Sequence, residues 1–389
     1  MIFKALYYFI LTTFSRKKYR VAVSEYFTKA HFFSVISASD EKRYPLIFVT
    51  SYPLSPEDKA LLKRYNVPHF LFFPHKIGTK LQEVIPMNRK MRIVSCIRAF
   101  LLKLVFCRPS IHFIVVDDLT YLTCGLVILD RWLNGFIKVV YLPHGIHHIG
   151  RKFSESKILY FGKLPKNKLY KKYKFFLNKQ IVFNDMYFTL CIYRFYEAMQ
   201  YLNTVQEIEI TQNYILFMGG FEESYSFDTV MKYYDFMNKI RDKLKEKFNF
   251  KDEYFIYRPH PSEREIFFKK YKKHLNWDIS NSTLSEDLLK SNVILSLASS
   301  SLLEASQFGK KHVLMLNPHD VDTSIYSQEY SEGVIYLPEI KSPNDLIEYY
   351  EKNAISANNI LNRNELILAL KNKYDLAINQ YREAIWGKN

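Results

Sequence analysis

The chain has 389 residues, of which 48% are hydrophobic, and it carries a formal net charge of +16. This composition is globular, and the length suffices for two domains with large cores. The positive charge favours anionic partners such as nucleotide sugars, acidic polysaccharide or anionic lipid. No common nucleic-acid-binding module is present, so nucleic acid is not an expected partner. Four scattered cysteines without C-x-x-C spacing indicate reduced thiols, which suits a cytoplasmic protein.

The first twenty residues combine an apolar run that reaches Phe14 with a basic end at 16–20. The apolar run is too short to span a bilayer, and it lacks the cleavage site of a secretion signal. It fits equally well a buried first element and an interfacial anchor whose basic side chains meet anionic headgroups. In both cases we expect a cytoplasmic protein, and in the second it is peripheral on the inner face of the membrane.

The next stretch of the chain alternates short apolar runs with segments of helical periodicity, as a doubly wound α/β domain does. The helices are expected to start near Pro56, to run from 87 to 106, and to pass through Leu126 and Trp132. The strands are predicted at 46–50, 70–73, 111–116 and 137–142.

An acidic pair, Asp117 and Asp118, follows the third of these strands. Neighbouring carboxylates raise each other's pKa, which would suit one of them to abstract a proton as a general base. The same pair would also cap the following helix, where negative charge is favourable. Position alone does not separate the two roles.

His144 and Gly145 lie in a loop with three histidines that follows the fourth strand. The spacing of these histidines is wrong for a zinc site, and no cysteine or carboxylate lies near them in sequence. No metal is therefore expected. We expect a substrate-binding loop, with a purely structural turn as the close alternative.

The second half opens with a strand at 214–218 that ends in Gly219 and Gly220, and glycines there let a ligand approach the backbone closely. A helix from about 229 to 247 leads to a strand at 254–257. This strand runs out into Arg258, Pro259, His260 and Pro261, which place a guanidinium and an imidazole at its carboxyl end.

The best-defined unit of the sequence is a βαβ crossover between about 288 and 316. A short helix ends near Ser291, and an apolar run through Leu297 predicts a buried strand. Ser299, Ser300 and Ser301 follow, then a helix at 302–308 and a strand at 313–316. The serines fit both an anion-binding turn and simple helix capping. The remaining elements are a strand at 333–337 and helices at 345–352 and 362–385.

Two motifs carry a resemblance to known proteins. Arg-Pro-His-Pro at 258–261 and LASSSLLEA at 297–305 resemble the nucleotide-binding half of bacterial sialyltransferases, namely the polysialyltransferase and lipooligosaccharide sialyltransferase families. A third mark of those families is an acidic pair followed by glycine, whereas Asp117 and Asp118 are followed here by Leu119.

The resemblance implies an α/β, GT-B-like fold with two Rossmann-type doubly wound domains that face a central cleft. We expect an acceptor-side domain at 1–205, a nucleotide-sugar-binding domain at 206–360 and a C-terminal helix at 361–389. It also implies inverting, metal-independent transfer of sialic acid from CMP-sialic acid to a hydroxyl of capsule polysaccharide or lipooligosaccharide, without a cofactor.

The resemblance assigns the role of general base to the acidic pair, and the other site roles follow from the residues themselves and their places at strand ends. Asp117 or Asp118 would deprotonate the acceptor hydroxyl, and His260 would stabilise the leaving phosphate. His144 and Gly145 would contact the substrate. The expected nucleotide-binding residues are Arg258, Pro261, Gly219, Gly220, Ser299, Ser300 and Ser301.

Two other functions fit the sequence. CDP-glycerol-type glycerophosphotransferases of cell-surface polymer synthesis also carry a His-Gly pair, here at 144–145, and Arg-Pro-His-Pro. The residue Leu119 favours that reading, because it replaces the glycine of the sialyltransferase mark. A non-catalytic glycan- or membrane-binding protein on the same fold would not depend on His260.

Overall fold

The chain forms two compact units, Met1–Tyr193 with Asp375–Asn389 and Arg194–Tyr374. The boundaries between them fall within two helices, α7 (Thr189–Thr204) and α14 (Arg363–Trp386). The computed structural model describes residues 2–24, 29–73, 89–108, 110–116, 121–132, 137–142, 157–161, 181–184, 189–205, 210–212, 214–220, 226–260, 265, 267–297, 301–308, 312–317, 338–355 and 359–386.

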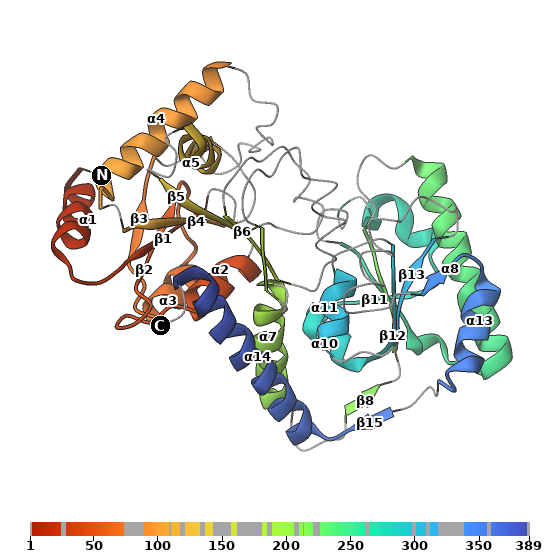
Figure 1. The fold of residues 1–389 in the computed structure, drawn as a ribbon. Helices are drawn as coiled ribbons and strands as arrows, with labels where there is room; N and C mark the ends of the chain where they lie inside the picture. Colours follow the sequence, from red (N-terminus) through yellow and green to blue (C-terminus); the bar gives the residue numbers. More distant parts are fainter. Residues whose placement is uncertain are drawn as a thin grey trace. The chain divides into compact units, whose positions relative to one another are not determined.

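The first unit is built on a parallel sheet, which has seven strands within the described residues, in the order β3-β2-β1-β4-β5-β6-β7 (Figure 1). All residues of β1 and β2 are buried, as expected of parallel strands covered on both faces. The strands are β1 Arg20–Ser24, β2 Leu46–Thr50, β3 His69–Leu71, β4 His112–Val116, β5 Lys138–Leu142, β6 Lys157–Phe161 and β7 Ile181–Asn184.

Helices lie on both faces of this sheet, with α4 (Arg89–Val105) and α5 (Tyr121–Trp132) on one side and α2 (Lys29–Ser37) and α3 (Pro56–Arg64) on the other (Figure 1). The N-terminal helix α1 (Ile2–Phe14) contacts α4. Local sequence explains where α3 begins, because Ser55 accepts a hydrogen bond from the Asp58 amide and proline occupies the first turn.

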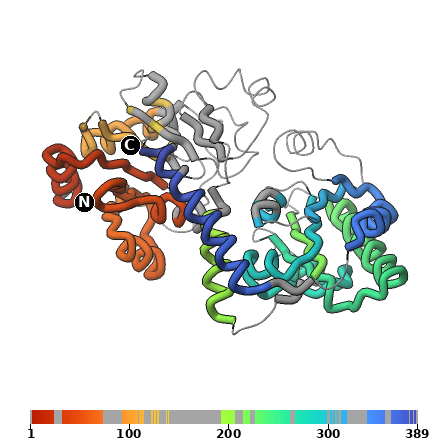
Figure 2. The backbone as a smooth tube through the Cα atoms, turned by 60° about the horizontal axis from the view of Figure 1, so that its bottom comes forward, coloured from red at the N-terminus to blue at the C-terminus, as the bar shows by residue number. Residues whose placement is uncertain are grey.

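The C-terminal end of α14 belongs to the first unit (Figure 2). Arg20, the first residue of β1, is buried and donates from Nε to the Ile385 carbonyl at 3.1 Å and from Nη1 to the Ser110 carbonyl at 3.3 Å. Burial lowers the pKa of Arg20. A cation is favourable at a helix C-terminus, where carbonyls lack partners. Arg20 therefore ties the start of the sheet to the end of the chain, and it is not available to meet a membrane.

The second unit repeats the design with a parallel sheet, six-stranded within the described residues, in the order β11-β10-β9-β12-β13-β14 (Figure 1). Its strand β12 is buried along its whole length. The strands are β9 Tyr214–Met218, β10 Phe255–Arg258, β11 Asp278–Ile279, β12 Ser291–Ser296, β13 His312–Leu316 and β14 Glu339–Ile340.

In the second unit, α8 (Phe227–Phe248) and α13 (Pro343–Lys352) contact each other on one face of the sheet, and α10 (Leu284–Lys290) and α11 (Ser301–Gln307) cover the other (Figure 1). Capping boxes start α10 and α13. Short 3-10 turns (Asp252–Tyr254, Lys272–His274) and a π-helical turn (Phe267–Tyr271) join β10 to its neighbours. A separate antiparallel pair, β8 (Ile210–Gln212) with β15 (Asn359–Leu361), links the ends of α7 and α14.

Most predicted elements are present within one to three residues of their expected bounds, including the βαβ crossover of β12, α11 and β13. The helices α2 and α7 were not predicted, nor were the short strands β1, β6, β7, β8, β11, β14 and β15. The strand expected at 333–337 lies outside the described residues.

Gly125 offers a test of the packing in the first unit. A Cβ at this position would lie 2.0 Å from the Ser95 carbonyl oxygen, because α4 and α5 approach closely there. Alanine is the better helix former by about 1 kcal/mol, but this clash involves backbone. We expect Gly125→Ala to lower the free energy of unfolding by about 2 kcal/mol, measured by urea denaturation.

Gly220→Ala is the matched control, since an added Cβ there meets no atom of the described part of the chain within 4 Å. It should change stability by less than about 0.5 kcal/mol. An equally stable Gly125→Ala protein would contradict the close approach of the two helices.

Candidate functional site

The strand order of the second sheet reverses between β9 and β12. Read along this unit, β9 to β14 adopt the order 3-2-1-4-5-6 of a Rossmann sheet, with β9 first and β12 fourth. The chain leaves these two strands toward opposite faces of the sheet, where α8 and α11 lie (Figure 1). Open α/β sheets bind ligands beyond the carboxyl ends of the strands at such a switch point. We therefore take this edge as the candidate site.

Predicted site residues of two neighbouring strands come together at this edge. The Gly219 amide, directly after β9, donates to the Arg258 carbonyl at the end of β10 at 2.8 Å. His260 follows the buried Pro259 and is exposed. Within the described residues, no atom lies within 4 Å of the position that a Cβ at Gly220 would take. The edge thus offers backbone without side chains next to an imidazole on the adjacent strand end.

The third segment at this edge comes from β12. Ser296, its last residue, is buried and donates from Oγ to the Met218 carbonyl at 2.9 Å, so the ends of β9 and β12 are joined directly. Ser301 is the first residue of α11 and is half-buried. Helix α11 is held in turn by Glu304, whose Oε2 lies 2.8 Å from Arg194 Nε. Glu304 is buried, so the ion pair fixes the helix that follows the serine segment.

Arg258 has partners inside its own unit. Its Nη1 donates to Asp287 Oδ2 at 2.7 Å, to the Ser282 carbonyl at 2.7 Å and to Ser280 Oγ at 3.3 Å. The Asp287 side chain is 4% exposed and also accepts from Ser280 Oγ at 2.5 Å. Burial raises the pKa of Asp287, although the Ser280 hydrogen bond and the Arg258 charge oppose the rise. Arg258 therefore joins β10 to α10, and its contact with a nucleotide stays a prediction.

Seven of the predicted site residues lie outside the described residues. Sequence adjacency alone locates one pair: Asp117 and Asp118 directly follow Val116, the last residue of β4. Strand β4 lies beside β1, at the switch point of the first sheet. The seven residues are Asp117, Asp118, His144, Gly145, Pro261, Ser299 and Ser300.

Sequence reasoning missed a polar pair at the same edge of the second sheet. Asn317, directly after β13, is buried and donates from Nδ2 to Glu339 Oε2 at 3.3 Å, while its amide donates to the Ile340 carbonyl at 2.9 Å. A polar residue at the end of an apolar run was the available signal. Parallel strands place such residues on one edge with Gly219 and His260.

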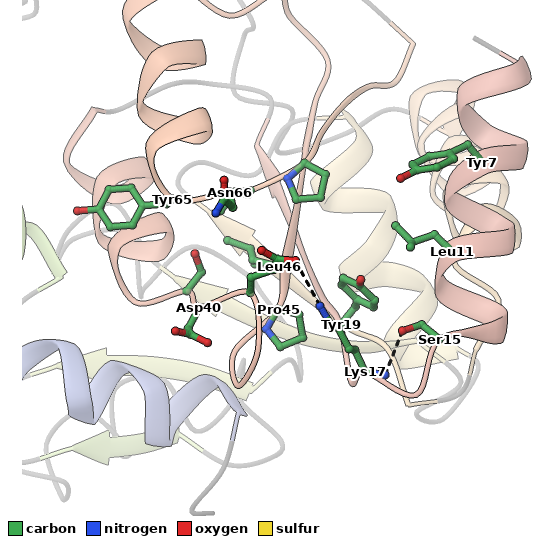
Figure 3. Close-up of a pocket in the computed structure, with 14 residues that line it drawn as sticks. Tyr7, Leu11, Ser15, Lys17, Tyr19, Asp40, Pro45, Leu46, Tyr65 and Asn66 are labelled. Atoms are coloured by element: carbon green, nitrogen blue, oxygen red, sulfur yellow. Dashed lines mark hydrogen bonds and ion pairs between the residues drawn. The ribbon is translucent and has the colours of Figure 1, made fainter.

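A cavity of about 360 Å³ lies elsewhere, in the first unit (Figure 3). Its lining includes Tyr19, Pro45 and Pro68, which immediately precede β1, β2 and β3. This is the amino edge of the sheet, opposite to the edge where open α/β proteins bind ligands. The cavity is therefore not the candidate nucleotide site.

No protein-family model matches the chain, and no curated protein matches it. Solved structures with the same architecture match the chain in fold. A glycosyltransferase from Rickettsia africae ESF-5 superposes with a TM-score of 0.52 at 13% identity, over 96% of this chain and 100% of that chain. The UDP-GlcNAc 2-epimerase from Neisseria meningitidis, bound to UDP-GlcNAc, gives 0.51 at 12% identity, over 95% and 100%. The S. aureus MnaA structure with UDP gives 0.51 at 12% identity, over 94% and 95%.

At these identities the likeness establishes the fold alone. Together with the two parallel sheets, it shows that the chain has a GT-B-like fold of two Rossmann-type domains, as the sequence predicted. Transferases and epimerases both occur among these structures, so the fold does not choose between their reactions.

The Arg258–Asp287 pair can be tested by a double-mutant cycle. Arg258→Ala leaves a buried carboxylate without its cation and should cost about 3 kcal/mol of stability. Adding Asp287→Ala removes that carboxylate, so the double variant should lose less than the sum of the two single variants. Urea denaturation of the four proteins gives the coupling energy, and strictly additive losses would contradict the structural role of Arg258.

Proposed function

We propose that this protein is a glycosyltransferase that binds a nucleotide sugar at the carboxyl edge of its second sheet. One observation carries the proposal. Gly219-Gly220 and Arg258-Pro259-His260 leave neighbouring strands beside the Rossmann switch point, and the serine segment follows the strand on its other side. The Arg-Pro-His-Pro and serine segments are those that resemble bacterial sialyltransferases, and open α/β sheets bind ligands at such an edge.

The donor we propose is CMP-sialic acid. Two of the similar structures hold UDP-GlcNAc or UDP, which supports a nucleotide-bearing ligand for this edge. The choice of the cytidine nucleotide and of sialic acid rests on the resemblance of residues 258–261 and 297–305. The proposed acceptor is a hydroxyl of a cell-surface glycan, either capsule polysaccharide or lipooligosaccharide.

The proposed transfer is a single displacement. The acceptor oxygen bonds to the anomeric carbon of sialic acid, the bond from that carbon to the CMP phosphate oxygen breaks, and the configuration inverts. The hydroxyl proton goes to Asp117 or Asp118, and CMP leaves with the bonding pair. Negative charge grows on the phosphate during this step, so a hydrogen-bond donor placed there lowers the barrier. His260 is the residue we assign to that role, with Ser299, Ser300 and Ser301 as hydroxyl donors.

The residues of this mechanism require neither a cofactor nor a metal ion, because proton transfer and charge stabilisation are both provided by side chains. His144 and Gly145 are assigned to substrate contact, and Arg258 and Pro261 to the nucleotide side. Arg258 Nη1 donates to Asp287, so we assign Arg258 the role of holding the end of β10 in place on the nucleotide side.

A second candidate is transfer of glycerophosphate from CDP-glycerol. It is favoured by Leu119, which stands where the sialyltransferase mark has glycine, and by His144-Gly145. CMP is the leaving group in both reactions. They differ in the group transferred to the acceptor hydroxyl, which is sialic acid in the first and glycerophosphate in the second. A non-catalytic glycan-binding role on the same fold is the outcome expected if neither donor is consumed.

The proposed function predicts that His260→Ala and Asp117→Asn/Asp118→Asn each lower the rate of CMP release from CMP-sialic acid by about 100-fold or more. The assay contains capsule or lipooligosaccharide acceptor, and product is followed by mass spectrometry. His260 is exposed, so its replacement should leave the melting temperature almost unchanged.

Two comparisons make the result decisive. Replacing His274, a second histidine of the same unit, by alanine should leave CMP release unchanged. CMP release that persists in the double aspartate variant would overturn the assignment of the base. Consumption of CDP-glycerol but not of CMP-sialic acid by the unaltered protein would replace the first candidate by the second.

A further inference from the structure

We propose that helices α1 and α4 form a docking surface for an anionic lipid bilayer. We call this surface the α1–α4 face, and it comprises the exposed apolar side chains of Ile2–Phe14 and Arg89–Val105. The proposal concerns the first unit and is independent of the proposed reaction, which was assigned mainly from the second.

Helix α4 places its large apolar side chains on the outside. Its buried residues within the described side chains are Ser95, Ala99, Leu102 and Lys103, with Gly125 of α5 packed against the backbone of Ser95. A helix that packs on a soluble core normally shows the opposite pattern. The outward stripe is between 38% and 54% exposed and consists of Ile93, Val94, Ile97, Phe100, Leu101 and Leu104.

Helix α1 has the same character. Tyr8 and Thr12 are buried, and the Tyr8 hydroxyl donates to the His69 carbonyl at 3.0 Å. The residues three or four positions apart on the opposite face are apolar and between 48% and 89% exposed, namely Phe3, Leu6, Tyr7, Ile10 and Phe14. One face of α1 thus fixes the helix to the unit, and no described residue covers its other face.

The two helices are joined to each other. Tyr8 packs near Phe106, with 6.2 Å between the ring centroids, and Thr13 Oγ1 lies 3.6 Å from Cys107 Sγ. Arg108 donates to the Ser15 carbonyl. The end of α1 is therefore attached to the residues that directly follow α4. Exposed apolar stripes on two attached helices are typical of an interaction surface.

The charged residues on and beside α1 and α4 indicate which partner this face would bind. Neither α1 nor α4 contains an acidic residue. Lys4 is exposed on α1, Arg16 and Lys18 are exposed just after it, and α4 begins with Arg89 and Lys90. Apolar stripes flanked by cations suit insertion into the interface of a bilayer with anionic headgroups, whereas a protein partner would need matching acidic groups.

The surface would lie on the bilayer rather than cross it. None of the helices in the described residues is long and apolar enough to span a membrane. Interfacial helices place apolar side chains at the acyl boundary and cations at headgroup level, and the two stripes with their flanking basic residues fit this arrangement.

The experiment is sedimentation of the full chain with vesicles of phosphatidylcholine alone or with about one third phosphatidylglycerol. We expect binding to the anionic vesicles and at least tenfold weaker binding to the neutral ones. Ile97→Glu/Leu104→Glu should reduce binding to anionic vesicles at least tenfold, and so should Phe3→Glu/Phe14→Glu. These positions are exposed, so circular dichroism and the melting temperature should stay unchanged.

Leu368→Glu/Leu376→Glu is the matched control, because these α14 residues are 60% and 45% exposed and the change in charge is the same. It should bind as the unaltered chain does. Equal loss in this control, or equal binding to both kinds of vesicle, would overturn the proposal. So would a dimer of the unaltered chain, seen by light scattering, that the Ile97→Glu/Leu104→Glu variant dissociates, because a second copy would then cover the face.

Discussion

Every described strand of the two large sheets runs parallel to its neighbours, and this places all carboxyl ends of one sheet on a single edge. In the second unit, β9 and β12 lie side by side although the chain visits β10 and β11 between them. Their connections must therefore go to opposite faces, which leaves the edge between them open to a ligand. Residues from segments about 40 residues apart meet there for this reason alone.

Buried ion pairs hold the parts of this edge in place. Asp287 fixes Arg258 at the end of β10, and Glu304 fixes α11 to Arg194. Arg194 also lies 3.2 Å from Glu197 Oε2, and that oxygen accepts from Ser285 Oγ at 2.6 Å. Removing one member of a buried pair is costly because its partner is left without compensation. Polar residues near the candidate site therefore divide into those that build the edge and those, such as His260, that are exposed on it.

Much of the fold could be predicted because buried parallel strands have continuous apolar sequences. The strands β2 and β9 were located from LIFVT and YILFM, and Pro56 located the start of α3. The central strand β1 escaped notice because RVAVS begins with a buried arginine inside a basic stretch. Arg20 can be buried at the start of this strand because it donates hydrogen bonds to the carbonyls of Ser110 and Ile385, and both residues are distant in sequence.

The candidate site was predicted only in part for the same physical reason. Motifs are local, so the Arg-Pro-His-Pro segment was recognised, but the partner of Arg258 lies 29 positions away and has no spacing rule. Helix α1 was expected to be either buried or interfacial. It has one face of each kind, a distinction that depends on the elements packed against it.

The central claim is that the carboxyl edge of the second sheet binds a cytidine nucleotide, and a thermal-shift titration with CMP, CDP, UDP and GDP, with and without magnesium, tests it most directly. A ligand that binds only the folded state at about 100 times its Kd adds about 2.7 kcal/mol, which raises the melting temperature by several degrees. We expect such a rise with CMP in the absence of magnesium. We expect a smaller rise for Gly220→Ala, whose added methyl group would occupy the space beside the strand end. No shift with any of the four nucleotides, or a shift that Gly220→Ala leaves unchanged, would contradict the central claim.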